Sequence, residues 1–159
     1  MGRLDRLDRL ELKLPPLALF AGCVAGVVLL AYAWPGAGFE LPGRRVFGAA
    51  VIIGGVCIAL AGVVQFRRAG TTVNPLSPGN ARSVVTTGVF AWTRNPMYLG
   101  MAAALVGLST WLGTWPALLV AAAFCAYLTR FQIVPEERAL LDLFGEPYAR
   151  YCRRVRRWI

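Results

Sequence analysis

No charged residue interrupts the stretch MYLGMAAALVGLSTWLGTWPALLVAAAFCAYLT, which occupies residues 97–129. A helix needs roughly 20 residues to cross the hydrocarbon core of a bilayer, so this stretch is too long for a single crossing. Near its middle, Gly113-Thr-Trp-Pro116 is a turn signal, because glycine and proline interrupt helices. The stretch therefore predicts a helical hairpin with membrane helices at 97–113 and 115–134.

Two more uncharged runs precede the hairpin, at 14–34 and 46–66, and each contains 21 residues. Both are long enough to span a membrane. The chain as a whole is 57% hydrophobic, which exceeds the usual content of a soluble domain. We predict an all-α polytopic membrane protein with about four transmembrane helices, forming one membrane-embedded domain over residues 1–159.

The remaining segments contain the charges. Residues 1–13 have the pattern of a short amphipathic lead-in helix at the interface, and 67–96 form a loop rich in turn formers. Residues 135–159 are expected to form interfacial helices. The run at 14–34 lacks a small-residue cleavage site, so we treat it as a retained span and not as a signal peptide.

The basic residues predict the orientation. Fifteen of the 17 Lys and Arg fall in 1–13, 67–96 and 130–159, whereas only Arg44 and Arg45 lie between the first two spans. Because cytoplasmic loops are enriched in Lys and Arg, both termini should be cytoplasmic. Four predicted spans and a short N-terminal half suggest a compact bacterial-type protein, so we expect it in the bacterial inner membrane. The net charge of +9 fits anionic lipid headgroups, and no nucleic-acid-binding module is recognisable.

The composition also limits the chemistry. The chain has no histidine, and its four cysteines include no C-x-x-C pair. Histidine is the commonest neutral metal ligand and general base, so we expect no metal site. No phosphate-binding P-loop and no dinucleotide fingerprint are present.

Two polar segments flank the hairpin. In the first, Pro96 can open a helix that Asn95 caps, and Arg94 beside this helix start can bind a carboxylate or a phosphate. In the second, Glu136 and Glu137 lie at the end of the last span, where carboxylates are costly unless they have partners. The hairpin returns both segments to the same face of the membrane.

These two segments resemble the integral-membrane methyltransferases, which include isoprenylcysteine carboxyl methyltransferases and phospholipid N-methyltransferases. The resemblance covers 70–158. The first motif is matched by Gly88, Phe90, Arg94, Asn95, Pro96, Tyr98 and Gly100. The second is matched by Glu136, Glu137, Leu140, Phe144, Gly145, Tyr148 and Tyr151.

The resemblance implies S-adenosylmethionine as the methyl donor and a lipophilic or membrane-associated acceptor. It implies catalytic roles for Arg94, Tyr98 and Glu137. It also implies a cofactor site formed by Gly88, Asn95, Pro96, Tyr98, Gly100, Glu136, Glu137, Tyr148 and Tyr151. Methyl transfer from a sulfonium has a good leaving group, so positioning and desolvation can supply much of the catalysis.

The acceptor stays open at this stage. Phe90 replaces the tyrosine of many relatives, and Asn95 replaces the histidine of the eukaryotic carboxyl methyltransferases. A carboxylate or thiolate acceptor needs no general base, whereas an ammonium acceptor needs Glu137 or a tyrosine to remove a proton. The alternatives are a phospholipid N-methyltransferase, a membrane reductase of the sterol-reductase type, and a non-enzymatic membrane subunit.

Overall fold

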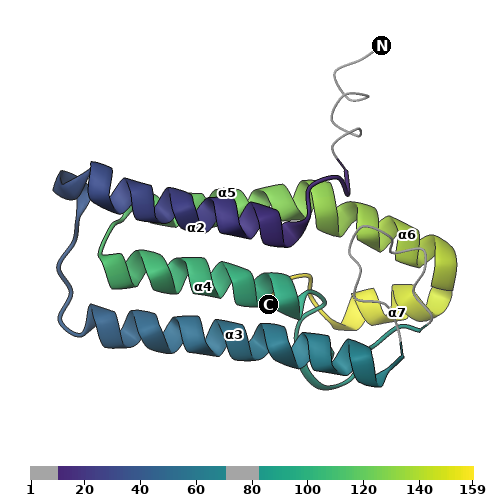
Figure 1. Cartoon of the computed structure of the whole chain (residues 1–159). Coiled ribbons are helices and arrows are strands. Elements are labelled where there is room, and N and C mark those ends of the chain that lie inside the picture. Colours follow the sequence, from purple (N-terminus) through teal and green to yellow (C-terminus); the bar gives the residue numbers. More distant parts are fainter. Residues whose placement is uncertain (1–10, 71–82) are drawn as a thin grey trace, which may run out of the picture.

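The computed structural model describes residues 11–70 and 83–159. The described chain is mainly helical and contains no strand; α2, α3, α4 and α5 lie side by side, and the shorter α6 and α7 extend from one end of them (Figure 1). Most of the lead-in expected at 1–13 and the middle of the loop expected at 67–96 lie outside the described residues. The elements are α2 (Pro16–Ala33), η1 (Pro35–Ala37), α3 (Arg44–Arg68), η3 (Gly88–Ala91), α4 (Pro96–Leu112), α5 (Pro116–Leu128), η4 (Thr129–Ile133), α6 (Val134–Phe144) and α7 (Glu146–Arg154).

Three helical segments are long and apolar enough to cross a membrane: α2, α3 and the continuous helix at 116–144. Helix α4 is also apolar but shorter, with 17 residues. It lies alongside the other three, so about four helices form the membrane-embedded bundle. The prediction of an all-α integral membrane protein is confirmed.

The hairpin turn lies where the sequence predicts it. Gly113 ends α4 with a φ of +71°, a left-handed conformation that glycine adopts without strain, and Pro116 opens α5. The last carbonyls of α4 have no partner within the helix, and Arg44 Nη1 donates to one of them, the oxygen of Trp111, at 2.6 Å. A side chain at Gly113 would collide with this guanidinium. The turn therefore depends on glycine for both its conformation and its space.

Helices α3 and α4 pack through glycine. Gly48, Gly55 and Gly62 repeat every seven residues along α3 and are its buried positions. A Cβ atom on Gly55 would lie 2.6 Å from the carbonyl oxygen of Gly100, and one on Gly48 would lie 2.7 Å from that of Gly107. Small residues at such positions let the two backbones approach within van der Waals contact, which is the usual way helices associate in membranes.

The apolar core lies between α2, α4 and α5. Val27, Leu105 and Phe124 are buried there, one from each helix. Phe20 packs edge to face on Phe124, with ring centroids 6.2 Å apart. This core fixes α4 against the helix that leads into the second polar segment.

A five-residue π-helix, η4, joins α5 to α6. Pro135 follows it, and a proline removes the hydrogen bond to the carbonyl four residues earlier. That carbonyl belongs to Phe131, and the backbone N–H of Leu12 donates to it at 3.0 Å. Glu11 also accepts hydrogen bonds of 2.5 Å from Arg130 in η4 and Arg138 in α6. These bonds hold the segment before α2 against the junction of η4 and α6.

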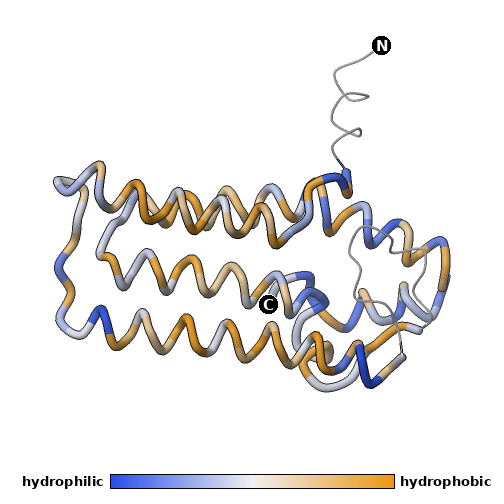
Figure 2. The backbone as a smooth tube through the Cα atoms, viewed as in Figure 1, coloured by the Kyte–Doolittle hydropathy of each residue, from blue (hydrophilic) through white to orange (hydrophobic). Residues whose placement is uncertain are grey.

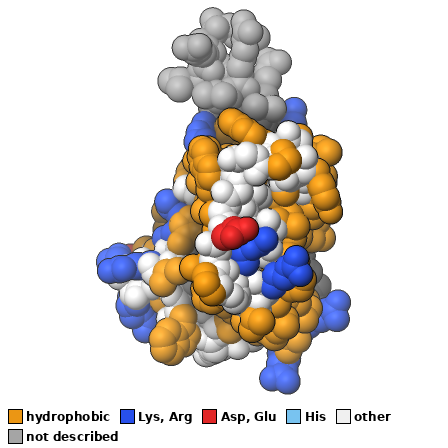
Figure 3. Space-filling model, turned by 90° about the vertical axis from the view of Figure 1, so that its left-hand side faces the viewer, with side chains coloured by type: hydrophobic (Ala, Val, Ile, Leu, Met, Phe, Trp, Pro, Cys, Tyr) orange, Lys and Arg blue, Asp and Glu red, His pale blue; other side chains and the backbone are white. Residues whose placement is uncertain are grey.

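The hydrophilic residues gather at one end of the bundle, where α2 begins, α3 ends, α4 begins and α6 and α7 lie (Figure 2). We call this the polar end. The opposite end consists of the turns between α2 and α3 and between α4 and α5. Hydrophobic and uncharged polar groups make up most of the surface of this end, and one small patch of acidic and basic side chains lies near its centre (Figure 3).

Candidate functional site

The two polar segments meet at the polar end. Pro96 opens α4, so Tyr98 lies in the first turn of this helix, and Glu136 lies in the first turn of α6. The Tyr98 hydroxyl donates to Glu136 Oε1 at 2.6 Å. A donor to a carboxylate oxygen at this distance forms a strong, charge-assisted hydrogen bond. The structure therefore joins two residues that the sequence places 38 positions apart.

The same carboxylate oxygen has a second donor. Gln132 Nε2 lies 2.7 Å from Glu136 Oε1, and the Gln132 side chain is buried within η4. The other oxygen, Oε2, receives no hydrogen bond from any described residue. Among the described residues, Glu136 is thus held through one oxygen.

Glu137 lies between two arginines. Arg157 makes a bidentate pair with it, through Nε at 3.0 Å and Nη2 at 2.7 Å, and Arg94 Nη2 lies 3.2 Å from Glu137 Oε1. The side chains of Arg94 and Glu137 are only 12% and 18% exposed. Arg94 Nε is fully buried and has no hydrogen-bond partner among the described residues. This atom is a donor that a bound carboxylate or hydroxyl oxygen would satisfy.

The C-terminal residues return to the start of α4. The backbone N–H of Arg94 donates to the carbonyl of Arg156 at 3.0 Å, and Asn95 Nδ2 donates to the carbonyl of Arg157 at 2.9 Å. Our expectation that Asn95 caps α4 with its side chain was wrong, because no side-chain cap is formed. A side-chain cap would use Asn95 Oδ1 to accept from an N–H in the first turn of α4, whereas here the side chain is oriented by its Nδ2, which donates to the C-terminal segment.

Helix α7 closes the site from the side. Gly145 ends α6 and Glu146 begins α7, and Tyr148 and Tyr151 form the buried face of α7. The Tyr151 hydroxyl donates to the carbonyl of Phe90 at 2.7 Å. Burial raises the pKa of both tyrosine hydroxyls above their ordinary value, so both stay protonated at neutral pH.

Other residues implied by the resemblance contact different partners. Gly88 has a φ of +57°, and the Gln65 amide occupies the space where its Cβ would lie. Gly100 faces Gly55 of α3, and Pro96 packs near Gly62. Helix packing and turn geometry therefore account for these three residues, and a cofactor contact at any of them stays a prediction.

Sequence reasoning missed three residues of this cluster. Gln132 precedes Glu136 by one helical turn, so i, i+4 spacing could have identified it. Arg157 was counted only among the basic residues that predict the orientation, and Trp158, whose indole N–H donates to Thr129 Oγ1 at 3.1 Å, was not singled out. No sequence signal indicates that the C-terminal residues fold back onto α4 and η4.

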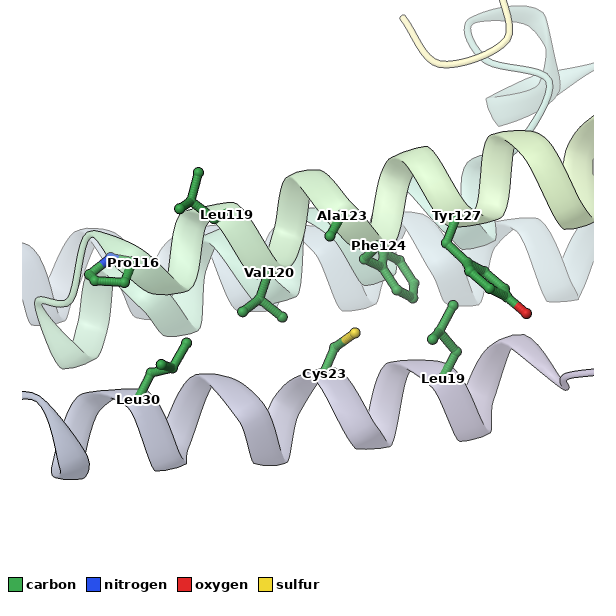
Figure 4. Close-up of a pocket in the computed structure, with 9 residues that line it drawn as sticks. All are labelled: Leu19, Cys23, Leu30, Pro116, Leu119, Val120, Ala123, Phe124 and Tyr127. Carbon is green, nitrogen blue, oxygen red and sulfur yellow. The ribbon is translucent and has the colours of Figure 1, made fainter.

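A groove lies in the apolar part of the bundle, away from the polar cluster. The groove, of about 500 Å³, runs between α2 and α5, with Cys23 and Leu30 on one side and Val120 and Phe124 on the other (Figure 4). Its lining carries no charged side chain. Over the described residues, no three His, Cys, Asp or Glu side chains are grouped closely enough to hold a metal ion.

Residues 43–147 match the family model described as phospholipid methyltransferase. The chain belongs to the phospholipid methyltransferase family. The matched region contains α3, the hairpin, Arg94, Glu136 and Glu137, whereas Arg157 and most of α7 lie beyond its end.

Two characterised enzymes are similar to this chain over about two thirds of its length. The protein-S-isoprenylcysteine O-methyltransferases of human and mouse are 30% and 29% identical to it, over 69% and 68% of this chain. The chain spans about two fifths of their length, 39% and 38%. An uncharacterised protein of Haemophilus influenzae is 40% identical along its whole length, which corresponds to 40% of this chain. The chain is thus an integral membrane member of a methyltransferase family.

Proposed function

We propose that this chain transfers a methyl group from S-adenosylmethionine to a lipophilic acceptor at the membrane surface. The supporting observation is that Glu136, Glu137 and Arg94 lie together where the apolar bundle ends. A water-soluble donor and a membrane-soluble acceptor can meet at such a boundary. The polar end would face the cytoplasm, because the basic residues concentrate there.

The chemistry of the cluster fits this cofactor. S-adenosylmethionine presents an ammonium group and ribose hydroxyls, which carboxylates bind well, and a carboxylate, which arginine binds well. Glu136 Oε2 receives no hydrogen bond from the described chain, and Arg94 Nε is a buried donor without a partner there. We expect Glu136 to accept from a cofactor hydroxyl or ammonium group, with Tyr148 and Tyr151 as one wall of the site.

When bound, the cofactor supplies an electrophilic methyl group on a positively charged sulfur. The chain's own residues then orient the two reactants and exclude water. Tyr98 holds Glu136, and Glu137 holds Arg94 in place beside the start of α4. Positioning of this kind supplies a large part of the rate enhancement in bimolecular reactions.

The acceptor belongs to one of two chemical classes. The names of the human and mouse relatives favour a thioether-linked isoprenylcysteine carboxylate, or a similar small carboxylate or thiol, which Arg94 would orient and which needs no base. The family description favours the amine of a phospholipid headgroup. An ammonium must first lose a proton, and Glu137 would then act as the base. The groove between α2 and α5 has an apolar lining suited to a hydrocarbon chain of either acceptor.

The test is calorimetric binding of S-adenosylmethionine to the detergent-purified protein. Glu136→Gln and Glu137→Gln should each weaken binding while the melting temperature shows that both variants are folded. Labelled methyl donor is then supplied with membrane lipids or with isoprenylcysteine analogues to separate the two acceptor classes. If the folded wild-type protein binds no S-adenosylmethionine in native lipids, the proposal fails and a non-catalytic membrane subunit becomes the better interpretation.

A further inference from the structure

Gln132 lies at an irregular point in the longest helix. The five residues Thr129–Ile133 form a π-helix between α5 and α6, and Gln132 is 2% exposed within it. A single π turn inside an α-helix is uncommon, and such turns are frequently found at functional sites. Pro135 can account for the irregular backbone at this point, because it removes a helical hydrogen bond, but it does not require a polar side chain at position 132.

A buried primary amide is costly without hydrogen bonds, so a hydrophobic residue would be the simpler choice at this position. The Gln132 side chain donates to Glu136 Oε1 at 2.7 Å. Tyr98 donates to the same oxygen from α4 at 2.6 Å, so the two donors approach Oε1 from different helices. Together they fix the rotation of the carboxylate about its last bond.

The consequence lies at the other oxygen. With Oε1 held by Gln132 and Tyr98, Oε2 is fixed in one direction and receives no hydrogen bond from the described part of the chain. A group held in this way loses less entropy when it binds a ligand than a freely rotating carboxylate would. The amide also keeps its hydrogens for the carboxylate at any pH, since it does not ionise.

We propose that Gln132 is a positioning residue, which orients Glu136 so that its free oxygen can accept a hydrogen bond from the methyl donor. This inference rests on the proposed function, because it takes S-adenosylmethionine as the ligand. Gln132 acts through Glu136 and does not itself contact the ligand. The residue extends the site beyond the two motifs and into the π-helix.

The test uses Gln132→Met in the full-length protein, with S-adenosylmethionine as the titrant. Methionine has a similar length and no donor, so the helix keeps its packing while Glu136 keeps only the bond from Tyr98. Loss of one hydrogen bond to a charged group should weaken binding about tenfold or more. The melting temperature in detergent should change much less than it does in a variant of the apolar core.

The chain offers a matched control, because Gln65 is its only other glutamine. Gln65 is half-buried in α3 beside Gly88, and none of its described contacts involves Glu136. Gln65→Met should leave the affinity for S-adenosylmethionine unchanged. Equal weakening by both substitutions would overturn the inference, since the effect would then follow from altered packing.

A second variant is Gln132→Asn, which keeps the amide but shortens the side chain by one methylene, so that the amide no longer reaches Glu136 Oε1. We expect this folded variant also to weaken S-adenosylmethionine binding, and this arm decides the question if Gln132→Met does not fold. Binding equal to that of the wild type, by either folded variant, would overturn the inference alone. A folded wild-type protein without any binding would overturn the proposed function and this inference with it.

Discussion

The hydroxyl of Tyr98 and the carboxylate of Glu136 are joined by a hydrogen bond of 2.6 Å that connects the first turn of α4 to the first turn of α6. This bond links the two polar segments across the hairpin. Because it involves a carboxylate in a sparsely hydrated region, it should contribute more than a hydrogen bond between neutral groups.

Tyr98→Phe removes this donor and leaves the ring in place. We expect unfolding in detergent to become easier by about 1–3 kcal/mol and S-adenosylmethionine binding to weaken about tenfold. Thermal melting and calorimetry measure the two effects. Tyr127→Phe is the control, because the Tyr127 ring packs on Phe131 one turn further along the same continuous helix and its hydroxyl has no hydrogen bond to a described residue. Equal effects of both substitutions would show that the Tyr98 hydroxyl has no special role.

The pair formed by Glu137 and Arg157 should be strongly coupled. It is bidentate, and the Glu137 side chain is only 18% exposed. A double-mutant cycle with Glu137→Gln and Arg157→Gln, measured by denaturant unfolding, should give a coupling of about 1–2 kcal/mol. We expect a smaller coupling energy than for a fully buried ion pair, because the Arg157 side chain is 36% exposed and water screens the interaction.

The exposed pair formed by Glu146 and Arg153 is the matched comparison. Both side chains are more than 60% exposed, and their hydrogen bond measures 2.5 Å. A cycle with Glu146→Gln and Arg153→Gln should give a coupling below about 0.5 kcal/mol, because water screens an exposed ion pair. If this surface pair is coupled as strongly as the pair at Glu137, burial does not explain the difference between them.

Glycine at position 55 should be essential for the contact between α3 and α4. A Cβ atom there would lie 2.6 Å from the carbonyl oxygen of Gly100, which is backbone and cannot rotate away. Gly55→Ala should therefore destabilise the protein by about 1–3 kcal/mol, the usual cost of overpacking. Its neighbour Gly54 is exposed and has no atom within 4 Å of its Cβ position, so Gly54→Ala should be neutral or slightly stabilising. Thermal melts of both variants test this difference, and the reverse order of stability would contradict the close approach of α3 and α4 at Gly55.

Alkaline pH should release α7 from η3. Burial raises the pKa of Tyr151 above its ordinary value, and its hydroxyl donates to the Phe90 carbonyl. An unfolded tyrosine ionises near pH 10, so above that pH the unfolded chain loses this proton first and stability falls as the pH rises further. Below about pH 10 both states hold the proton, and the contribution is present in full.

Melting temperatures between pH 8 and pH 11.5 measure this effect. The wild-type protein should lose stability more steeply above pH 10 than Tyr151→Phe, which should be about 1 kcal/mol less stable at neutral pH and less dependent on pH. Parallel curves for the two proteins would show that another group causes the alkaline loss.

The sequence alone determined the class of the fold. Charged residues are too costly in hydrocarbon to be scattered along a span, so long uncharged runs mark the membrane helices directly. Gly113 and Pro116 marked the hairpin turn because their backbone restrictions act locally, whatever the rest of the chain does. The two motifs at 88–100 and 136–151 also indicate the resemblance to membrane methyltransferases without any knowledge of tertiary contacts.

Only the tertiary structure decided how the polar groups pair. That Tyr98 reaches Glu136, and that Arg94 and Arg157 both reach Glu137, depends on how α4, α6 and the C-terminal residues pack, and these segments are separated in sequence. The capping role expected for Asn95 failed for the same reason, since the bond from Asn95 Nδ2 to the Arg157 carbonyl orients the side chain toward the C-terminal segment, and the side chain forms no cap on α4. Local propensity describes what a residue can do within a few positions of itself, whereas packing decides which of its possible partners is present.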